Sequence, residues 1–432
     1  MPGHATRAAM ALVSLSLLAP GAMAQCPAST PVQGAPMAQS PVFPADNWWN
    51  TDISAAPVDP SSAGFIAFIG NTRSLHPDFG GEEAGSTRIY GFPYAVVSGA
   101  QAKQAVTFDY WDESDGVDPN TGQGTPFYPI PSQAITQAHW IEGGAPGNVD
   151  ERGQADRHLL MVDCTNNHLY ELYDVYYSPT QGKWFAGSGA FFDMNRNDRR
   201  PEGWTSADAA GLAIFPGLVR YDEAGNASVP EIRHALRVTV RATNGYVYPA
   251  SHPAGNTAGA LPMGARLRLK TSVNGVDPAL RTNDPIARKI FRAMQKYGLI
   301  VADNGSDMYI SGTFDVRWDN GDLNPAFGAL KASDFEVIQR GWKPAPPPAA
   351  ALGSVGANPG TVVGGQSATG SVTLTAAAPA GGATVALASA SSAFSVPASV
   401  VVAQGATTAT FPITTVPTGT GPRVRFRQPT RA

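Results

Sequence analysis

The chain has 432 residues, of which 43% are hydrophobic, and its 30 Lys and Arg against 34 Asp and Glu give a net charge of −4. This length allows more than one domain with a sizeable core. The slightly acidic balance, and the lack of a basic stripe in residues 25–343, argue against nucleic acid as the partner.

The first residues are typical of a secretory signal peptide. Arg7 precedes an apolar run that ends in Ala22-Met-Ala24, which predicts cleavage after Ala24. The run is too short to cross a bilayer, and no later stretch is long and apolar enough to do so. We therefore predict that residues 1–24 are a signal peptide, that the mature chain is secreted to the extracellular space or the periplasm, and that it has no membrane span.

The chain contains two cysteines, Cys26 and Cys164. In an oxidising compartment they can form a disulfide that ties the mature N-terminus to a predicted strand near Asp163, or they can stay unpaired, and the sequence favours neither outcome. Two thiols supply neither a zinc cluster nor a disulfide framework, and the sequence predicts no metal site from them.

Residues 25–343 are predicted to form the main domain, because strand signals dominate them. Runs of β-branched and aromatic residues show partial period-two alternation and are separated by Gly, Pro, Asn or Asp. One helix is expected from Pro285, capped by Asn283 or Asp284 and stopped by Gly298. We predict a mainly β or β-rich α+β domain, a sandwich or distorted barrel with long loops. The predicted strands are 89–97, 157–163, 168–177, 184–192, 234–240, 265–273 and 307–318.

Composition changes abruptly after Lys343, since Pro344 to Pro422 contain no charged residue, no Trp and no Tyr. Residues 344–356 are typical of a proline-rich linker, and residues 357–432 contain short alternating runs that predict a small antiparallel sandwich. The sequences VGGQSATGSVTL and VPASVVVAQGATTATFPITT resemble bacterial immunoglobulin-like modules appended to secreted enzymes and surface proteins, which implies a role as spacer or adhesin.

The end of this module looks incomplete. A final strand is expected after Val416, but the chain continues as PTGTGPRVRFRQPTRA, with four Arg in a region otherwise without charge. We predict a truncated immunoglobulin-like β-sandwich with an unpaired edge strand, and the alternative is a basic tail.

The segment Gly187 to Glu223 is long, irregular and rich in Asp, Arg, Trp and Ser, which predicts a binding or catalytic loop. Its residue Asp208 has two interpretations. It can stand in the first turn of a short helix capped by Thr205 or Ser206. It can also be a site carboxylate beside Trp204, because an aromatic face next to a cation and a carboxylate commonly holds a sugar ring.

Two cations of the same loop, Arg199 and Arg200, have two interpretations as well. They can contact a substrate, or they can clamp the loop by pairing with Asp193 or Asp198. Tryptophans in loops can form stacking platforms for sugars, and His158 lies at a strand start with both a structural and a functional interpretation. The predicted substrate-binding residues are Trp204, Arg199, Arg200, Trp48, Trp49 and His158.

Carboxylates near histidines are the best catalytic candidates, because cleavage of a sugar linkage needs one group to give a proton and another to take one or stabilise charge. His234 begins a predicted strand, where a structural role competes, whereas His252 lies in a Pro-flanked loop. Asp303 lies in ADNGSD, which is either an Asn-Gly hairpin turn or part of a cleft. The predicted catalytic residues are Asp208, Asp193, His252, His234 and Asp303.

The acidic loop DESDGVDPNTG, residues 112–122, has the oxygen ligands that calcium prefers, but not the ordered spacing of a known calcium loop. It is either a solvated acidic loop or a calcium site, and we predict no cofactor with calcium as the alternative. No G-x-S-x-G, H-E-x-x-H, Walker or dinucleotide motif occurs, which disfavours a peptidase, an esterase or a nucleotide-binding protein.

Several stretches of the main domain, among them DRHLLMVD, WTSADAAGLAIFPGLVRYDE and YGLIVADNGSDMYISG, resemble an uncharacterised recurring family of secreted proteins. The resemblance implies a shared fold and site, but it assigns no catalytic residue. From the residues themselves we predict a secreted carbohydrate-active protein, a polysaccharide hydrolase or lyase acting on a polysaccharide or cell-surface glycan. The alternative is a non-catalytic glycan-binding or cell-surface adhesion protein.

Overall fold

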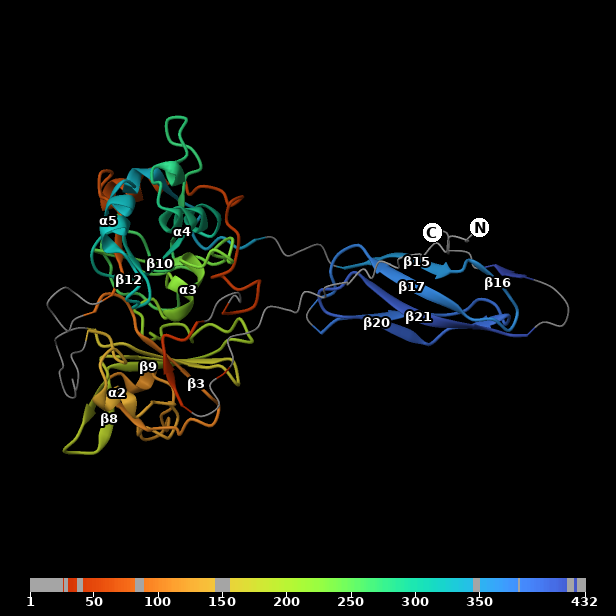
Figure 1. Cartoon of the computed structure of the whole chain (residues 1–432), viewed down its shortest axis with the longest axis horizontal. Helices are drawn as coiled ribbons and strands as arrows, with labels where there is room; N and C mark the ends of the chain where they lie inside the picture. Colours follow the sequence, from red (N-terminus) through yellow and green to blue (C-terminus); the bar gives the residue numbers. More distant parts are fainter. Residues whose placement is uncertain are drawn as a thin grey trace, which may run out of the picture. The chain divides into compact units, whose positions relative to one another are not determined.

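The structure, a computed structural model, describes residues 26, 30–36, 42–81, 89–143, 156–344, 350–379, 381–417 and 423–425. The chain forms two compact units, Met1–Lys343 and Pro344–Ala432 (Figure 1). Strand accounts for 31% and helix for 14%, so the predicted mainly β fold class is confirmed. The predicted signal peptide lies outside the described residues. No helix among the described residues combines the length and the apolar character that a membrane crossing needs.

The first unit contains a mixed six-stranded sheet in the order β14-β11-β12-β10-β13-β2. Two neighbouring pairs, β10 with β12 and β13 with β2, are parallel, and the other pairs are antiparallel. This arrangement brings segments far apart in sequence side by side. The strands are β2 (His76–Asp78), β10 (Leu236–Val240), β11 (Arg266–Leu269), β12 (Leu299–Asn304), β13 (Tyr309–Ser311) and β14 (Phe335–Val337).

Three helices pack on strands of this sheet: α1 (Ser62–Ile69) on β14, α4 (Pro285–Lys296) on β11 and α5 (Asn320–Gly328) on β2. The predicted helix is confirmed as α4. Asp284 caps it by accepting hydrogen bonds from two backbone N–H groups of the first turn. Gly298 follows its last turn with φ +77°, a conformation that favours glycine.

A five-stranded sheet in the order β1-β3-β5-β6-β9 forms the other half of the first unit, and the small sheet β4-β8-β7 lies beside it. The buried strand β5 contributes Leu160 and Val162 to one hydrophobic cluster and Leu159 and Met161 to another, so both faces of this sheet are covered. The strands are β1 (Val32–Gln33), β3 (Tyr94–Val97), β4 (Val106–Phe108), β5 (Leu159–Asp163), β6 (His168–Tyr173), β7 (Tyr176–Ser178), β8 (Lys183–Ala186) and β9 (Ser188–Asp193).

Short helical turns complete the unit, and a disulfide between Cys26 and Cys164 fixes the described N-terminal residue beside the end of β5. The open question about these two cysteines is therefore settled in favour of the bond. The short turns are η1 (Trp111–Glu113), α2 (Gln133–Thr136), η2 (Phe215–Gly217), α3 (Tyr221–Ala224), η3 (Pro278–Leu280) and η4 (Ala332–Asp334).

The segment ADNGSD does not form the Asn-Gly hairpin that its sequence favours. Strands β12 and β13 do not pair with each other, because β10 lies between them. Thr239 of β10 is the register partner of Asp303 on one side and of Tyr309 on the other. The turn therefore passes around the end of β10, and this places Asp303 on a polar part of the sheet.

The second unit contains a four-stranded sheet, β15-β17-β21-β19, and two strand pairs, β16-β22 and β18-β20. β15 begins inside the predicted linker 344–356, so that boundary is wrong. A short strand, β22, follows Val416 and pairs with β16, in the part of the chain for which the sequence predicted a truncated sandwich. The strands are β15 (Leu352–Asn358), β16 (Thr361–Val363), β17 (Ala368–Leu374), β18 (Ala383–Ala386), β19 (Phe394–Ser395), β20 (Ser399–Val402), β21 (Thr408–Thr415) and β22 (Arg423–Arg425).

Candidate functional site

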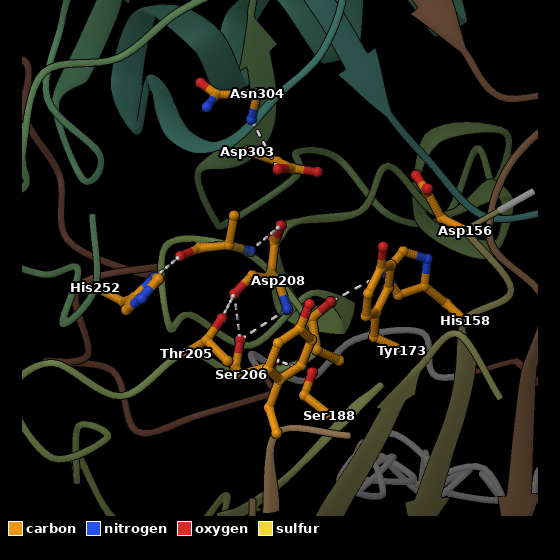
Figure 2. Close-up of a pocket in the computed structure, with 13 residues that line it drawn as sticks. Asp156, His158, Tyr173, Ser188, Thr205, Ser206, Asp208, His252, Asp303 and Asn304 are labelled. Atoms are coloured by element: carbon orange, nitrogen blue, oxygen red, sulfur yellow. Dashed lines mark hydrogen bonds between the residues drawn. The ribbon is translucent and has the colours of Figure 1, made fainter. Parts of the chain in front are cut away.

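A cavity of about 310 Å³ lies in the first unit, where the loop after β9 meets the end of β12 (Figure 2). Its lining comes from seven separate parts of the chain. Two tyrosines, two histidines and three aspartates are among the lining side chains, so the cavity is polar and rich in groups that can exchange protons. The lining residues are Tyr110, Asp156, His158, Tyr173, Ser188, Thr205, Ser206, Ala207, Asp208, Ala209, His252, Asp303 and Asn304.

Asp208 forms a buried bidentate ion pair with Arg237 of β10. The guanidinium Nε and Nη2 each lie 2.7 Å from a carboxylate oxygen, and the Asp208 side chain has no exposed surface. Planar two-point contacts of this kind are among the strongest charge-assisted hydrogen bonds. Asp208 therefore orients Arg237, and it is poorly placed to exchange a proton with a substrate.

The short helix that one interpretation of Asp208 required does not form. Instead, the Ser206 hydroxyl accepts a hydrogen bond from the Asp208 backbone N–H at 2.9 Å and donates one to the Leu212 carbonyl oxygen at 2.5 Å. Ser206 is buried, so it closes a turn that points Asp208 inward. The carboxylate meets Arg237 because of this turn.

Asp303, at the end of β12, is the carboxylate of this cluster that reaches solvent. Its Oδ2 lies 3.0 Å from Nη2 of Arg237, and its side chain is 27% exposed. Burial raises the pKa of Asp303 and the nearby Asp208 carboxylate raises it further, while Arg237 lowers it, and the result is a pKa of about 6. A carboxyl group with this pKa can both hold and release a proton near neutral pH.

His158 forms a fixed cationic wall of the cavity. Its Nδ1 lies 2.5 Å from a carboxylate oxygen of Glu142, and its Nε2 lies 3.0 Å from the Ala207 carbonyl oxygen. Burial lowers the pKa of His158, but Glu142 outweighs this effect and raises it to about 9. Both ring nitrogens face acceptors, so both can donate, as they do in an imidazolium ion.

His252 lines the cavity from the loop after β10, with its side chain 27% exposed. Its Nδ1 lies 2.9 Å from the Ala209 carbonyl oxygen, which fixes the tautomer with the proton on Nδ1. Its Nε2 is 4.0 Å from Glu113 and can act as an acceptor. Beside Asp303, Asn304 has a buried Oδ1 without a hydrogen-bond partner among the described residues, which is a ready acceptor for a ligand.

The structure does not bring Asp193 and His234 to the cavity. Asp193 lies five residues along β9 from Ser188, about 17 Å at the rise of a strand, and it accepts hydrogen bonds from Asn195 in a turn. His234 is buried, with Nε2 2.8 Å from Glu223 and Nδ1 2.8 Å from the Ala235 carbonyl oxygen. Neither side chain is among the residues that line the cavity.

The predicted tryptophan platforms Trp48 and Trp49 are 5% and 0% exposed and belong to the hydrophobic core. They cannot stack on a bound sugar, because the free energy of burying such large apolar rings keeps them inside. Trp204 is half-buried and packs against Arg200, with the guanidinium carbon 5.2 Å from the ring centroid. It precedes the lining residue Thr205 but does not itself line the cavity.

Arg199 and Arg200 clamp the loop, although not through the aspartates that the sequence suggested. Arg199 bonds the Pro249 carbonyl oxygen at 2.8 Å and Glu202 at 2.7 Å. Arg200 pairs with Asp115 and bonds the carbonyl oxygens of Glu113 and Thr205. These contacts hold the loop that carries Asp208 against the acidic loop.

Two carboxylates of the acidic loop form hydrogen bonds and ion pairs with other parts of the protein. Asp115 pairs with Arg200 and accepts from the Phe191 N–H at 2.8 Å, and a carboxylate oxygen of Glu113 accepts from the Thr205 N–H at 2.8 Å. Within the described ranges, no group of three His, Cys, Asp or Glu side chains is placed to hold a metal ion.

The site residues that were not identified from the sequence include Arg237, Glu142, Tyr110 and Tyr173. A signal existed for Arg237, since a cation in the middle of the apolar strand LRVTV has to be buried with an anionic partner. The other three carry no local signal. Comparison of the chain with protein-family models, curated proteins and solved structures finds no match.

Proposed function

We propose that the chain is a secreted carbohydrate-active enzyme that cleaves a polysaccharide or cell-surface glycan, by hydrolysis or by elimination. The observation that carries the proposal is the convergence of Asp303 and His252 in one cavity that Tyr110 and Tyr173 also line. Glycan cleavage needs a proton donor and a proton acceptor on the two sides of the bond, and aromatic side chains are suitable walls for a sugar ring.

Each group then has a role. Asp303 in its neutral form donates a proton to the glycosidic oxygen that leaves. His252 Nε2 accepts a proton, either from the attacking water in hydrolysis or from a ring carbon in elimination. Arg237, held by Asp208, positions Asp303, and His158, fixed by its pairing with Glu142, forms a wall of the cavity.

Two further features support a secreted role. The disulfide between Cys26 and Cys164 is of a kind that forms in oxidising compartments. The second unit is a small β module almost free of charge, and it suits the role of spacer or adhesin that we infer for it. A catalytic unit joined to such a module would act close to a surface or a polymer.

The test is an activity screen of the purified full chain on neutral, uronate-containing and sulfated glycans. New reducing ends report hydrolysis, and unsaturated products report elimination. The informative variant is Asp303→Asn, and the matched control is Asp193→Asn, which changes the same group outside the cavity. Turnover that Asp303→Asn abolishes and Asp193→Asn preserves supports the proposal.

Two outcomes would contradict it. Equal activity of both variants on the best substrate would remove Asp303 from the mechanism. Tight retention of a glycan by the wild-type chain, with no new reducing end and no unsaturated product, would favour the non-catalytic glycan-binding alternative.

A further inference from the structure

A second cavity, of about 420 Å³, lies beside β2 and β13 and plays no part in the chemistry described above. Its polar lining comes from the turn after α1 and from these two strands. The side chains that matter are those of Thr72, Arg73, Ser74, His76 and Tyr309. A function for this cavity goes beyond the cleavage step and rests on the proposed function.

Strand register makes the two cavities neighbours. Tyr309 of the second cavity and Asp303 of the first are both register partners of Thr239, one on each side. Strands lie about 4.8 Å apart, so the two residues are separated by roughly 10 Å. The exposed residues Gly305 and Ser306 connect the two strands at this point, and neither carries a large side chain.

The β2 edge presents its polar side chains in a regular alternation. Ser74, His76 and Asp78 are half-buried, whereas Leu75 and Pro77 between them are buried. Period-two alternation puts the polar set on one face of the sheet. Ser311, the register partner of Asp78, accepts a hydrogen bond from Arg237 at 2.7 Å, so this polar face continues to the first cavity.

The two cavities differ in charge. The first is lined by Asp156, Asp208 and Asp303, whereas among the described residues that line the second there is no carboxylate. The second cavity has Arg73 and His76 in its lining, and the ammonium of Lys331 lies 2.6 Å from the Ser74 hydroxyl. The nearby carboxylate of Asp307 is already paired with Arg241. An anion therefore fits the second cavity better than the first.

The second cavity also has an aromatic wall. The rings of His76 and Tyr309 lie 4.3 Å apart at 37°, next to each other on parallel strands. Ring faces of this kind pack against the apolar face of a sugar, while the cations beside them bind a charged substituent. An anionic sugar has both features.

We propose that the second cavity is a subsite that binds an anionic sugar unit, bearing a carboxylate or a sulfate, of a glycan chain whose cleaved linkage lies in the first cavity. The enzyme would then act on acidic polysaccharides and would grip the chain beside the cleavage point. Arg73 supplies the charge for this contact. It is exposed, so its replacement should not disturb the fold.

Binding of the full chain to paired polymers tests the subsite. Polygalacturonate against its methyl ester isolates the carboxylate, and dextran sulfate against dextran isolates the sulfate. Arg73→Gln is the informative variant, and Arg233→Gln is the matched control, because Arg233 is exposed and lines neither cavity. We expect preference for one charged polymer of a pair, and a dissociation constant raised about tenfold by Arg73→Gln and less than about twofold by Arg233→Gln.

The result also separates the subsite from the proposed function. If Arg73→Gln binds like Arg233→Gln, or if the wild-type chain binds neither charged polymer, the subsite is wrong, and loss of turnover in Asp303→Asn can still uphold cleavage. If Arg73→Gln weakens binding while no glycan is cleaved, the subsite stands and the proposed function fails.

Discussion

Two clusters of the first unit both contain an arginine paired with carboxylates, but they differ in exposure and in the role that we infer for them. In one, Arg237 pairs with Asp208 and Asp303. In the other, Arg220 lies 2.7 Å from Glu223, which also bonds His234. Every side chain of the second cluster is at most 8% exposed, whereas Asp303 in the first is 27% exposed.

The balance between burial and neighbouring charges sets a different acidity for the carboxylates of the two clusters. Burial raises the pKa of Glu223, but Arg220 and His234 more than compensate and hold it below the ordinary value. The pKa of Asp303 goes the other way, to about 6. Two basic side chains outweigh burial at Glu223, whereas burial and a second carboxylate outweigh the single cation Arg237 at Asp303. Asp303 can therefore hold and release a proton near neutral pH. Residue type alone does not distinguish the two clusters.

The largest effect is expected from Asp303→Asn. If Asp303 is the proton donor, turnover should fall by about 10²- to 10⁴-fold, the usual contribution of a general acid. The free energy of unfolding should change by less than about 1 kcal/mol, because Asn keeps a hydrogen-bonding group at a partly exposed position. Steady-state rates on the best glycan, together with urea unfolding of the same sample, measure both quantities. If Asp303→Asn lost stability and kept its turnover, Asp303 would have a structural role, as Glu223 does.

Glu223→Gln should have the opposite effects, with a large loss of stability and no loss of turnover. Removing one charge of a buried pair leaves Arg220 undercompensated, and such changes cost roughly 3–5 kcal/mol. Asp222, 3.9 Å from the guanidinium Nε, should keep the loss near the lower end. Turnover per folded molecule should stay at the wild-type level. Urea unfolding midpoints and rates normalised to folded protein measure these quantities. A fall in normalised turnover would show that the Glu223 cluster influences the reaction in the first cavity.

Asp208→Asn sharpens the contrast, since Asp208 shares the open cluster but has no exposed surface. It should lose stability as Glu223→Gln does, and it should lose turnover too, because Arg237 and Asp303 lose their orientation. The same two measurements apply. Wild-type turnover in folded Asp208→Asn would mean that Arg237 does not position Asp303.

Much of the fold was predictable because its signals are local. The cap at Asp284, the proline after it and the stop at Gly298 lie within or next to one helix, and α4 forms between them. Strand runs such as HALRVTV also carry their own pattern. The Asn-Gly hairpin, one of the two interpretations of ADNGSD, does not form, because strand pairing is decided between distant segments and β10 lies between β12 and β13.

The site was predictable only in part, for the same reason. Loops and charges pointed to Asp208, His252 and Asp303, and all three line one cavity. The sequence could not predict that Asp208 orients an arginine while Asp303 can exchange a proton. This difference depends on Arg237, which is 29 positions from Asp208 in the chain. Glu142, which makes His158 cationic, lies in a stretch without any pattern.

The two clusters should also respond to pH with opposite signs. The pKa of Asp303 is raised from 3.8 to about 6, so its contribution to stability is present below about pH 4 and is lost as the pH rises through 6. The pKa of Glu223 is lowered, so its contribution is present above 4.5 and is lost as the pH falls. Melting temperatures measured from pH 3 to 8 test this. Between about pH 4 and 6, the melting temperature of Asp303→Asn should fall less steeply with rising pH than that of the wild type. Below about pH 4.5, the melting temperature of Glu223→Gln should fall less steeply with falling pH than that of the wild type. The pKa argument would be contradicted if Asp303→Asn changed the slope at the acid end and Glu223→Gln changed it between about pH 4 and 6.

The smallest effect is expected from Asp193→Asn, although the sequence placed Asp193 among the catalytic candidates. Its Oδ1 accepts hydrogen bonds from the backbone N–H and the amide of Asn195, and the oxygen of an Asn side chain can accept them equally well. We expect stability within about 0.5 kcal/mol of wild type and an unchanged rate. Since the same change is made at Asp303, a difference in rate between the two variants reports position alone. An equal loss of rate at both positions would mean that long-range charge, and not access to the cavity, governs the reaction.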